Sequence, residues 1–589
     1  MGGSPPVAYA EGIAAHLDLP LTDGLNLVDQ DPNLLPNLRL RAGADAAARA
    51  EPLLRELGAL AGGELGALAH AANAHPPVLR QYDARGERVD EVVYHPAYRE
   101  LCRLGFERFQ LAAMSHRPAL GWPSPVPHAV KYALSYVFAQ AEFGVLCPIS
   151  MTDSAARMLR LFGGPELASP YLEGLTAARL EDQLTGAMFV TERQGGSDVG
   201  ATATEARHDG SDWLLSGQKW FASNVDADVV LTLARLPDGA PGTRGLGLFL
   251  VPRLCPDGSR NRYRIDRLKD KLGTRSMATG EVTLDGAFAL PVGDLAHGFR
   301  QMAEMINVSR LSNAMRAAGL MRRALLEAAW HARHRHAFGR RLLDAPLLRR
   351  SLLPLVLHAE AALAFVLEAS AVLDAADAGS PEAARRLRVL TPLAKYTICK
   401  RARSVTAEAM EVRGGNGYVE DWIDPRLLRD AHLGSIWEGS SNVVALDVGR
   451  AMRRDGAVDV LLRDLEARLG RLSDPDVRRG AEALTPELRD AVTRVARMAD
   501  AWDEAVLGAL TERLSDLTMA VLLLEEAEHH VRAGLGYRKL LVAATYVTEV
   551  VRGSRPWDEA PPALRWLDEL TGGGDVPAEA ARSALPNAR

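Results

Sequence analysis

The chain has 589 residues, of which 47% are hydrophobic and 24% are charged, and its formal net charge at pH 7 is −6. This length exceeds what one hydrophobic core supports, and it predicts about three or four domains of ordinary globular composition. The small negative charge argues against nucleic-acid binding through bulk charge alone.

The four cysteines, Cys102, Cys147, Cys255 and Cys399, lie far apart and lack the spacing of metal ligands. So few cysteines in so long a chain predict reduced thiols in a soluble, cytoplasmic protein. We expect no secretory signal, because the N-terminus lacks a basic segment followed by an apolar one. We also expect no membrane span, because the uninterrupted apolar runs are too short to cross a bilayer.

Residues 1–185 are predicted to form a mostly helical N-terminal domain. Apolar residues at helical spacing mark residues 46–68, which Gly62-Gly63 interrupt, and an extended segment follows the His75-Pro76-Pro77 sequence. Residues 128–151 are typical of a further helix, which we expect to end at Cys147-Pro148.

Residues 186–290 are predicted to form a β domain. Short β-branched or apolar runs bounded by Gly, Pro or Asp indicate strands at 186–191, 229–234, 247–251, 263–268 and 280–284. The pattern of residues 213–223 favours two strands around a turn. Several short strands within about a hundred residues are typical of a small barrel or sandwich.

Residues 291–453 return to a helical pattern, with long Ala/Leu/Arg-rich segments at 299–335, 346–376, 381–413 and 426–453. Four such segments separated by Gly or Pro predict an antiparallel four-helix bundle. Residues 454–589 are predicted to be a helical extension, whose polar tail after Gly572-Gly573-Gly574 we expect to be disordered. The expected fold class is therefore α+β and mostly α.

The octapeptide Ser435-Ile436-Trp437-Glu438-Gly439-Ser440-Ser441-Asn442 carries a carboxylate between an indole and a glycine. A carboxyl group that loses water against an aromatic ring has a raised pKa, which suits a base near neutral pH. The glycine and the hydroxyls that follow suit a backbone that approaches a ligand closely. On these eight residues alone, a surface glutamate that caps the next helix is the commoner interpretation.

Four further motifs each have an ordinary explanation as well as a functional one. The strand and glycine-rich loop at 188–198 can offer hydroxyls and backbone N–H groups to a ring edge or a phosphate, or simply form a turn. The aromatic pair in 218–223 can bury itself in a barrel core. The segment 335–339 can be a basic helix end, and the three glycines in 411–418 can cap a helix.

Taken together and in order, these motifs resemble the acyl-CoA dehydrogenase flavoprotein family over roughly residues 130–450. A helical domain, a β domain and a four-helix bundle also follow one another in that family. Within it, the chain is most similar to the alkylation-response branch named after AidB. The segments that carry this second likeness are 79–83, 95–97, 146–152, 267–273 and 435–442, and they extend it over nearly the whole chain up to residue 450.

The resemblance implies bound FAD and assigns residues to it. The implied set is Phe189, Val190, Thr191, Gly196, Ser197, Trp220, Phe221, Ser223, Trp437, Gly439, Ser440 and Asn442, joined by Arg335, Phe338, Glu411 and Gly415 from a neighbouring subunit. Many family members carry glutamine where this chain has Glu411. A cofactor shared between subunits implies a homotetramer, or at least a dimer.

By the same resemblance, Glu438 falls on the family's catalytic base. In the family this base removes an α-proton from an acyl thioester while a loop N–H and a ribityl hydroxyl polarise the carbonyl, and hydride leaves the β-carbon for flavin N5. This implies α,β-dehydrogenation of a short or branched acyl thioester, bound to CoA or a carrier, with an electron-transfer partner as acceptor. Arg310 falls on the arginine that helps to hold CoA, although Asn307 stands where the family often has aspartate.

Two other functions stay open. An AidB-like stress flavoprotein with little turnover would bind DNA, which requires local positive charge, yet residues 451–589 hold 19 basic and 24 acidic residues, a net charge of −5. A flavin monooxygenase of the same fold would not need Glu438. The remaining basic candidate is a group of arginines for which we expect pyrophosphate contacts or inter-subunit ion pairs, namely Arg322, Arg323, Arg333, Arg335, Arg340, Arg341, Arg349 and Arg350.

Overall fold

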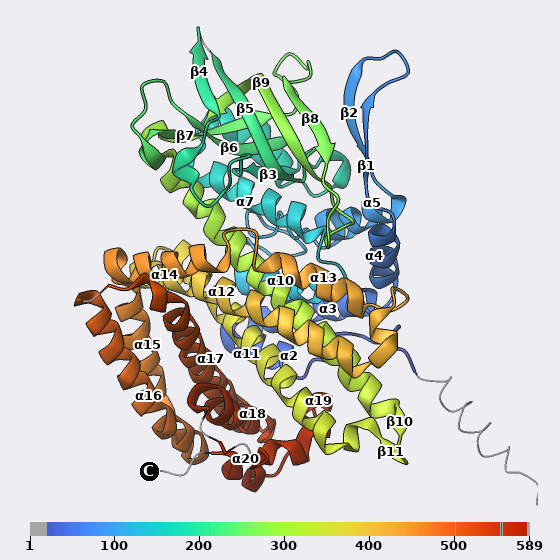
Figure 1. The fold of residues 1–589 in the computed structure, drawn as a ribbon, viewed down its shortest axis with the longest axis vertical. Helices are drawn as coiled ribbons and strands as arrows, with labels where there is room; N and C mark the ends of the chain where they lie inside the picture. The colour runs from blue at the N-terminus through green and yellow to red at the C-terminus, as the bar shows by residue number, and fades with distance from the viewer. Residues whose placement is uncertain (1–19, 211, 501, 554, 557, 586–589) are drawn as a thin grey trace, which may run out of the picture.

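The computed structural model describes residues 20–585 except 211, 501, 554 and 557. A β domain lies at one end of the molecule, long helices form its middle, and the C-terminal helices lie at the opposite end (Figure 1). The predicted α+β class with mostly helical structure is confirmed.

The N-terminal part is helical apart from one antiparallel hairpin. Its main elements are α2 (Leu34–Ala42), α3 (Ala44–Ala61), α4 (Glu64–Ala74), β1 (Val78–Tyr82), β2 (Arg88–Val93), α5 (Pro96–Cys102), α6 (His128–Ala139) and α7 (Leu146–Phe162). The prediction of one helix over residues 128–151 is wrong, because α6 ends at Ala139 and α7 begins at Leu146. Pro148 lies in the first turn of α7, where a missing N–H leaves no intrahelical bond unmade.

Seven strands form one sheet that curls into a barrel. They are β3 (Gly186–Phe189), β4 (Glu205–Asp209), β5 (Asp212–Ser223), β6 (Val229–Arg235), β7 (Leu246–Pro252), β8 (Tyr263–Leu268) and β9 (Thr279–Pro291). Their order is β3-β6-β4-β5-β9-β7, β8 pairs with β9, and a pairing between β6 and β7 closes the ring. Buried side chains such as Leu215, Phe249 and Val282 fill the interior.

Residues 213–223 lie in the single strand β5, so the prediction of two strands around a turn is wrong. A Cβ at Gly217 would lie 2.6 Å from the Oγ1 of Thr204 and 2.7 Å from its Cα, so glycine here permits a close backbone approach and no chain reversal. The register with β9 shifts twice, between Leu215 and Ser216 and between Lys219 and Ala222. Such bulges bend a strand around a barrel.

The long central helices are α10 (Gly298–His334), α11 (Pro346–Asp377) and α12 (Pro381–Val412), followed by α13 (Asp424–Gly434) and α14 (Ser441–Asp455). Among the described residues, α11 alone is long and apolar enough to cross a membrane, but 89% of its most apolar window is buried inside the protein. Its composition therefore suits its place between α10, α12 and the C-terminal helices. The predicted single helix over residues 426–453 is wrong, because the loop that carries Glu438 separates α13 from α14.

The C-terminal extension packs against the bundle through α17 (Leu507–Arg532), which contacts both α11 and α12. Its other main helices are α15 (Ala457–Arg471), α16 (Pro475–Asp500), α18 (Arg538–Tyr546), α19 (Leu567–Gly572) and α20 (Ala578–Ala584). The expectation of a disordered tail is wrong as far as residue 585, because α20 is helical and Ala581 is fully buried. Residues 586–589 lie outside the described part.

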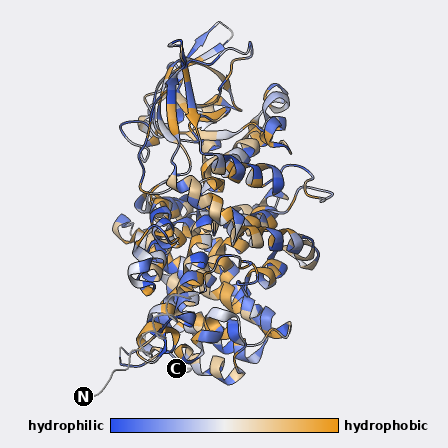
Figure 2. Cartoon of the chain, turned by 90° about the vertical axis from the view of Figure 1, so that its right-hand side faces the viewer, coloured by the Kyte–Doolittle hydropathy of each residue, from blue (hydrophilic) through white to orange (hydrophobic). Residues whose placement is uncertain are grey.

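Buried ion pairs join this extension to the bundle. The fully buried Lys539 Nζ lies 2.9 Å from Glu360 Oε2 on α11 and 2.7 Å from Glu526 Oε2 on α17. Arg41 of α2 and Arg468 of α15 both pair with Glu368 of α11. Figure 2 shows hydrophilic and hydrophobic residues mixed along the helices of this part of the molecule.

Candidate active site

The loop between α13 and α14 presents Glu438 in a conformation that is uncommon for a side chain larger than glycine. Glu438 has φ 57° and Gly439 has φ 95°, and left-handed backbone at a non-glycine residue costs roughly 1–3 kcal/mol. Two cations from different helices hold the loop. Arg310 Nε of α10 donates to the Glu438 carbonyl at 3.0 Å, and Lys395 Nζ of α12 donates to the Gly439 carbonyl.

The Glu438 carboxyl group is shielded from water although the residue as a whole is only half-buried. Its Oε2 is buried and accepts no hydrogen bond from any residue that the structure describes. Burial raises the pKa of Glu438, and the Ser309 hydroxyl and the charges of Arg310, Arg316 and Lys395 oppose that rise. A carboxylate with a raised pKa and a free oxygen is suited to accept a proton near neutral pH.

Trp437 forms one side of this site. Its ring stacks on Phe143 with a centroid distance of 5.9 Å, and the Arg316 guanidinium carbon lies 4.8 Å from the Trp437 ring centroid and 5.1 Å from that of Phe143. The indole Nε1 is buried without a partner within the described part of the chain. Sequence reasoning missed Arg316 and Lys395, since nothing distinguishes them from the other basic residues of α10 and α12.

At the barrel rim, the residues expected to bind flavin surround Thr191. The backbone N–H of Trp220 donates to the Thr191 carbonyl at 2.9 Å. A Cβ at Gly196 would lie 2.4 Å from Thr191 Oγ1, so only glycine leaves that hydroxyl in place. Sequence reasoning missed Glu192, which anchors the rim loop by accepting hydrogen bonds from Lys219 Nζ at 2.9 Å and from the Ala203 N–H at 2.7 Å.

The charge state of Glu192 is fixed by its partners. Burial alone would raise its pKa, but the Lys219 ammonium and the Thr204 hydroxyl hold the pKa of Glu192 at about 2. The rim loop is therefore anchored by an ionised carboxylate at neutral pH. This leaves the two glycines and the Ser197 hydroxyl of residues 195–197 on the accessible side.

Trp220 is half-buried beneath the Lys269 ammonium. A series of polar contacts also leads from this rim toward Glu438. Lys269 Nζ lies 3.6 Å from the Trp220 ring centroid, while Phe221 is 57% exposed. Ser223 Oγ lies 3.4 Å from Thr279 Oγ1, which accepts from Lys271 Nζ at 3.1 Å.

Lys271 in turn lies close to the residues around Glu438. Burial lowers the pKa of Lys271 to about 8, and Cys147, Asp430 and Glu142 are the neighbours that oppose this lowering. Burial raises the pKa of the Cys147 thiol, and Glu438 raises it further. Lys271 therefore connects the barrel rim, through Thr279, with the surroundings of Glu438.

The four residues that the resemblance assigns to a neighbouring subunit lie elsewhere. Phe338 is 96% exposed, Glu411 and Gly415 are exposed, and Arg335 is half-buried. Arg335 directly precedes β10 (His336–Ala337), which lies at the end of α10 remote from the barrel (Figure 1). One copy of the chain therefore does not bring these residues to its own Thr191.

Ser440 and Asn442, at the start of α14, are exposed, and Val190 and Ser197 remain accessible at the barrel rim. The side chains of Phe189 and Arg310 are buried in contacts other than those expected with flavin and CoA. Phe189 is 2% exposed within the barrel core, so only its backbone can pass beside a flavin. Arg310 is 7% exposed and its Nη1 lies 2.6 Å from Asp447 Oδ2, which makes it a clamp for the Glu438 loop.

The arginine group does not form a continuous basic surface, because five of its eight members bind acidic or carbonyl oxygens of the same chain. Arg322 and Arg323 are buried near Asp31 and Glu327. Arg333, Arg341 and Arg349 contact the segment 564–571 of the extension. These arginines therefore serve internal packing, which corrects the expectation of pyrophosphate or inter-subunit contacts for them.

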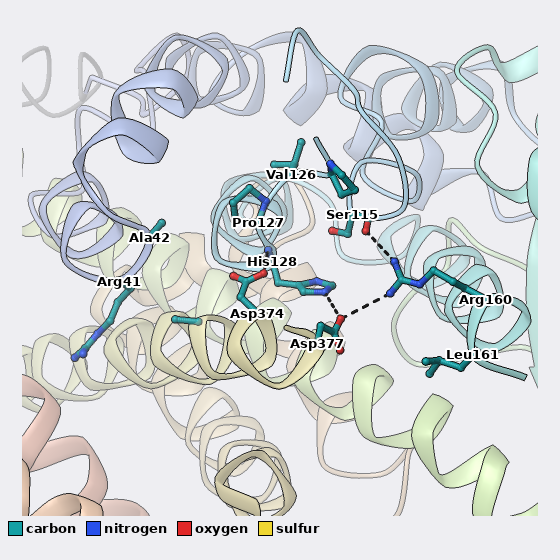
Figure 3. Close-up of a pocket in the computed structure, with 12 residues that line it drawn as sticks. Arg41, Ala42, Ser115, Val126, Pro127, His128, Arg160, Leu161, Asp374 and Asp377 are labelled. Atoms are coloured by element: carbon teal, nitrogen blue, oxygen red, sulfur yellow. Dashed lines mark hydrogen bonds and ion pairs between the residues drawn. The ribbon is translucent and has the colours of Figure 1, made fainter. Parts of the chain in front are cut away.

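A cavity of about 580 Å³ lies away from Glu438, between the ends of α2, α6, α7 and α11 (Figure 3). His128 Nε2 lies 3.1 Å from Asp377 Oδ2, and both Asp377 oxygens also accept from Arg157 at 2.6 and 2.7 Å. Asp374 accepts from the first N–H groups of α6. The acidic groups of this cavity are thus engaged in holding α6, α7 and α11 together.

Three domain families match the sequence. The adaptive response protein AidB N-terminal domain matches residues 19–182, the acyl-CoA dehydrogenase middle domain matches residues 187–287, and the acyl-CoA dehydrogenase C-terminal domain matches residues 296–453. The chain is 38% identical over 427 residues to the putative acyl-CoA dehydrogenase AidB of Escherichia coli strain K12, covering 70% of this chain and 75% of that protein.

The chain is also 33% identical over 453 residues to acyl-CoA dehydrogenase family member 11 of Caenorhabditis elegans, covering 74% and 72% of the two chains. Among solved structures, C. elegans ACDH-11 in complex with C11-CoA matches with a TM-score of 0.83 and 29% identity, over 91% of this chain and 93% of that one. An acyl-CoA dehydrogenase from Bacillus anthracis complexed with FAD shares the fold, with a TM-score of 0.64 and 18% identity over 83% and 88% of the chains. The chain therefore belongs to the acyl-CoA dehydrogenase family of FAD-dependent oxidoreductases, in its AidB-like branch.

Proposed function

We propose that this protein binds FAD and dehydrogenates an acyl thioester between its α- and β-carbons, with Glu438 as the base. One observation carries the proposal. The Glu438 carboxyl group has a raised pKa and a buried, free oxygen, and its loop is clamped from α10 by Arg310 and from α12 by Lys395. A purely structural glutamate would pair its carboxylate with one of these cations.

The residues present fit a bound flavin. Trp437 offers a buried indole N–H without a partner among the described residues, and Gly196 keeps the Thr191 hydroxyl free of a clashing Cβ. Ser197 and Ser223 add hydroxyls at the same rim, and Trp220 adds an aromatic face. When bound, FAD supplies the electron acceptor that no side chain provides.

The chain's own residues then account for the proton and the geometry. Glu438 takes the α-proton, and its raised pKa makes its carboxylate a stronger base than an ordinary glutamate. The clamps of Arg310 and Lys395 fix the loop, so that the carboxylate does not have to be ordered when substrate arrives. Trp437 and Phe143 exclude water from one side of the site.

The assembly and the substrate class follow from the exposed residues and from the relatives. Phe338, Glu411 and Gly415 are exposed far from Thr191, as expected if a second copy supplies them to each flavin, which supports a homo-oligomer with the tetramer as our proposal. The likeness to ACDH-11 with C11-CoA supports a CoA thioester as substrate. The four free cysteines support a cytoplasmic location, and an electron-transfer protein is the proposed acceptor.

DNA binding is not favoured. Residues 451–589 carry a net charge of −5, and five of the eight candidate arginines are engaged within the chain. Phosphate contacts require accessible positive charge.

The test is anaerobic bleaching of the flavin by a panel of acyl-CoA and acyl-carrier thioesters, with the wild type and its Glu438→Gln variant. Loss of a positioned base should slow bleaching by roughly 10²–10⁴-fold. Glu482→Gln, which changes an exposed glutamate of α16, is the matched control and should bleach at the wild-type rate. Absence of bleaching by every thioester, or equal bleaching by the Glu438→Gln variant, would refute the proposal.

A further inference from the structure

Arg316 on α10 is a fully buried cation beside the proposed base. It is 1% exposed, and its guanidinium lies against the rings of Trp437 and Phe143. Its Nε donates to the Ser312 carbonyl of its own helix at 3.3 Å, while its Nη1 is buried without a partner in the described part of the chain. The Cys147 thiol, a weak acceptor, is the side chain that hydrogen-bonds this guanidinium. Arginine keeps its charge in proteins, so Nη1 still requires an acceptor.

The groups around Arg316 do not supply enough negative charge to balance the buried cations. Glu438 is the carboxylate among the groups that act on Arg316, the others being the thiols of Cys147 and Cys399. Glu438 also faces the Lys395 ammonium, which among the described residues bonds to the Gly439 carbonyl oxygen alone. Since Arg310 pairs with Asp447, Arg316 and Lys395 remain as two buried cations for the one carboxylate of Glu438. Uncompensated buried charge is strongly unfavourable, so an anion is expected to complete the site.

The polar atoms near Arg316 point to the same conclusion. The buried atoms Trp437 Nε1, Glu438 Oε2, Tyr132 Oη and Arg316 Nη1 all lack partners among the residues described. The Ser309 hydroxyl and the charge of Arg316 both oppose the rise that burial causes in the pKa of Glu438, and the charge of Arg316 also opposes the rise that burial causes in the pKa of Tyr132. A plain alkyl chain at this place would leave these groups unsatisfied, which is costly. An acyl chain that ends in a carboxylate would accept hydrogen bonds from two of them, Arg316 Nη1 and Tyr132 Oη.

We propose that Arg316 determines substrate specificity by binding a second carboxylate at the far end of the acyl group, so that the preferred substrates are monothioesters of dicarboxylic acids. This inference rests on the proposed function, in that a thioester binds at Glu438. A guanidinium presents two parallel N–H donors to a carboxylate, and its position against two aromatic rings fixes their direction. Glu438 stays free to accept the α-proton.

The experiment measures binding without turnover. S-pentyl-CoA and S-(4-carboxybutyl)-CoA are thioethers of matched chain length that lack the thioester carbonyl and cannot be dehydrogenated. Calorimetric titration of the flavin-loaded wild type should give a dissociation constant lower for the carboxylated ligand by roughly 10- to 100-fold, since a charge-assisted hydrogen bond replaces an unpaired group. The Arg316→Met variant should lose this preference to within about threefold.

Two further variants keep the result interpretable. Arg316→Lys retains a cation on a shorter side chain and should keep part of the preference. It remains informative even if Arg316→Met does not fold, and circular dichroism shows whether each variant is folded. Arg479→Met, at an exposed position of α16, should behave as wild type. Equal affinity of the wild type for the two ligands would overturn the inference. An equal loss of affinity for both ligands in the Arg316 variants would also overturn it, because Arg316 would then serve only as the counterion of Glu438.

Bleaching by the thioesters pentanoyl-CoA and glutaryl-CoA separates this inference from the proposed function. If both bleach the flavin equally and the ligands bind equally, the dehydrogenase assignment stands and the specificity assignment fails. If neither bleaches while the carboxylated thioether binds more tightly through Arg316, the specificity assignment stands and the dehydrogenase assignment fails.

Discussion

Replacing Arg310 by methionine tests whether this residue clamps the Glu438 loop or holds CoA. The arginine donates to the Glu438 carbonyl at 3.0 Å and to Asp447 Oδ2 at 2.6 Å, and the Arg310 and Asp447 side chains are only 9% and 14% exposed. A hydrogen bond that involves a charged group contributes about 1.5–3 kcal/mol. Because Asp447 keeps its bond from Arg388 at 2.8 Å, we expect the loop to lose about 3 kcal/mol.

The assay is amide hydrogen exchange of residues 435–442, followed by mass spectrometry, because this reports the local opening of the loop. A loss of about 3 kcal/mol corresponds to exchange that is roughly 100-fold faster. Asp447→Asn should produce a smaller increase, and combining it with Arg310→Met should add little, because the two residues form one interaction. Arg479→Met is the control and should leave exchange in this loop unchanged.

The opposite result would refute the clamp. If exchange in the loop rises less than about threefold while the affinity for CoA thioethers falls tenfold or more, Arg310 acts mainly on the ligand. The prediction made from family resemblance would then be correct.

Two further predictions concern buried charge. Lys539→Met should destabilise the protein by about 3–5 kcal/mol, because it leaves Glu526 unpaired and leaves Glu360 with Arg538 alone, and adding Glu526→Gln should restore part of the loss in denaturant titrations. A loss below 1 kcal/mol would contradict this. Burial raises the pKa of Asp430 to about 6, so in the folded state its ionised form is disfavoured and stability falls as pH rises from about 4 to about 6. Asp430→Asn still accepts the Thr274 N–H and should raise the thermal midpoint at pH 8 but not at pH 4. An equal shift at both values would exclude titration of Asp430 as the cause.

Much of the fold was readable from local sequence, because helix periodicity and turn residues act over a few positions. The expected helices at 299–335, 346–376 and 381–413 correspond closely to α10, α11 and α12. The errors occurred where a distant segment decides the local structure. Gly217 lies in a continuous strand because Thr204 packs against its backbone, and α20 is ordered because α18 covers it.

The sequence alone determined the family and indicated Glu438 as the proposed base, because the motif around Glu438 and the motifs of the barrel rim are each contiguous in the chain. Only the tertiary structure showed that Arg310 and Arg316 of α10 and Lys395 of α12 converge on that base from positions far away in the sequence. It also assigned Arg310 to the loop and placed Phe189 inside the barrel. The physical reason is that burial and pairing of charge depend on which helices pack together, and no pattern within a single helix records its neighbours.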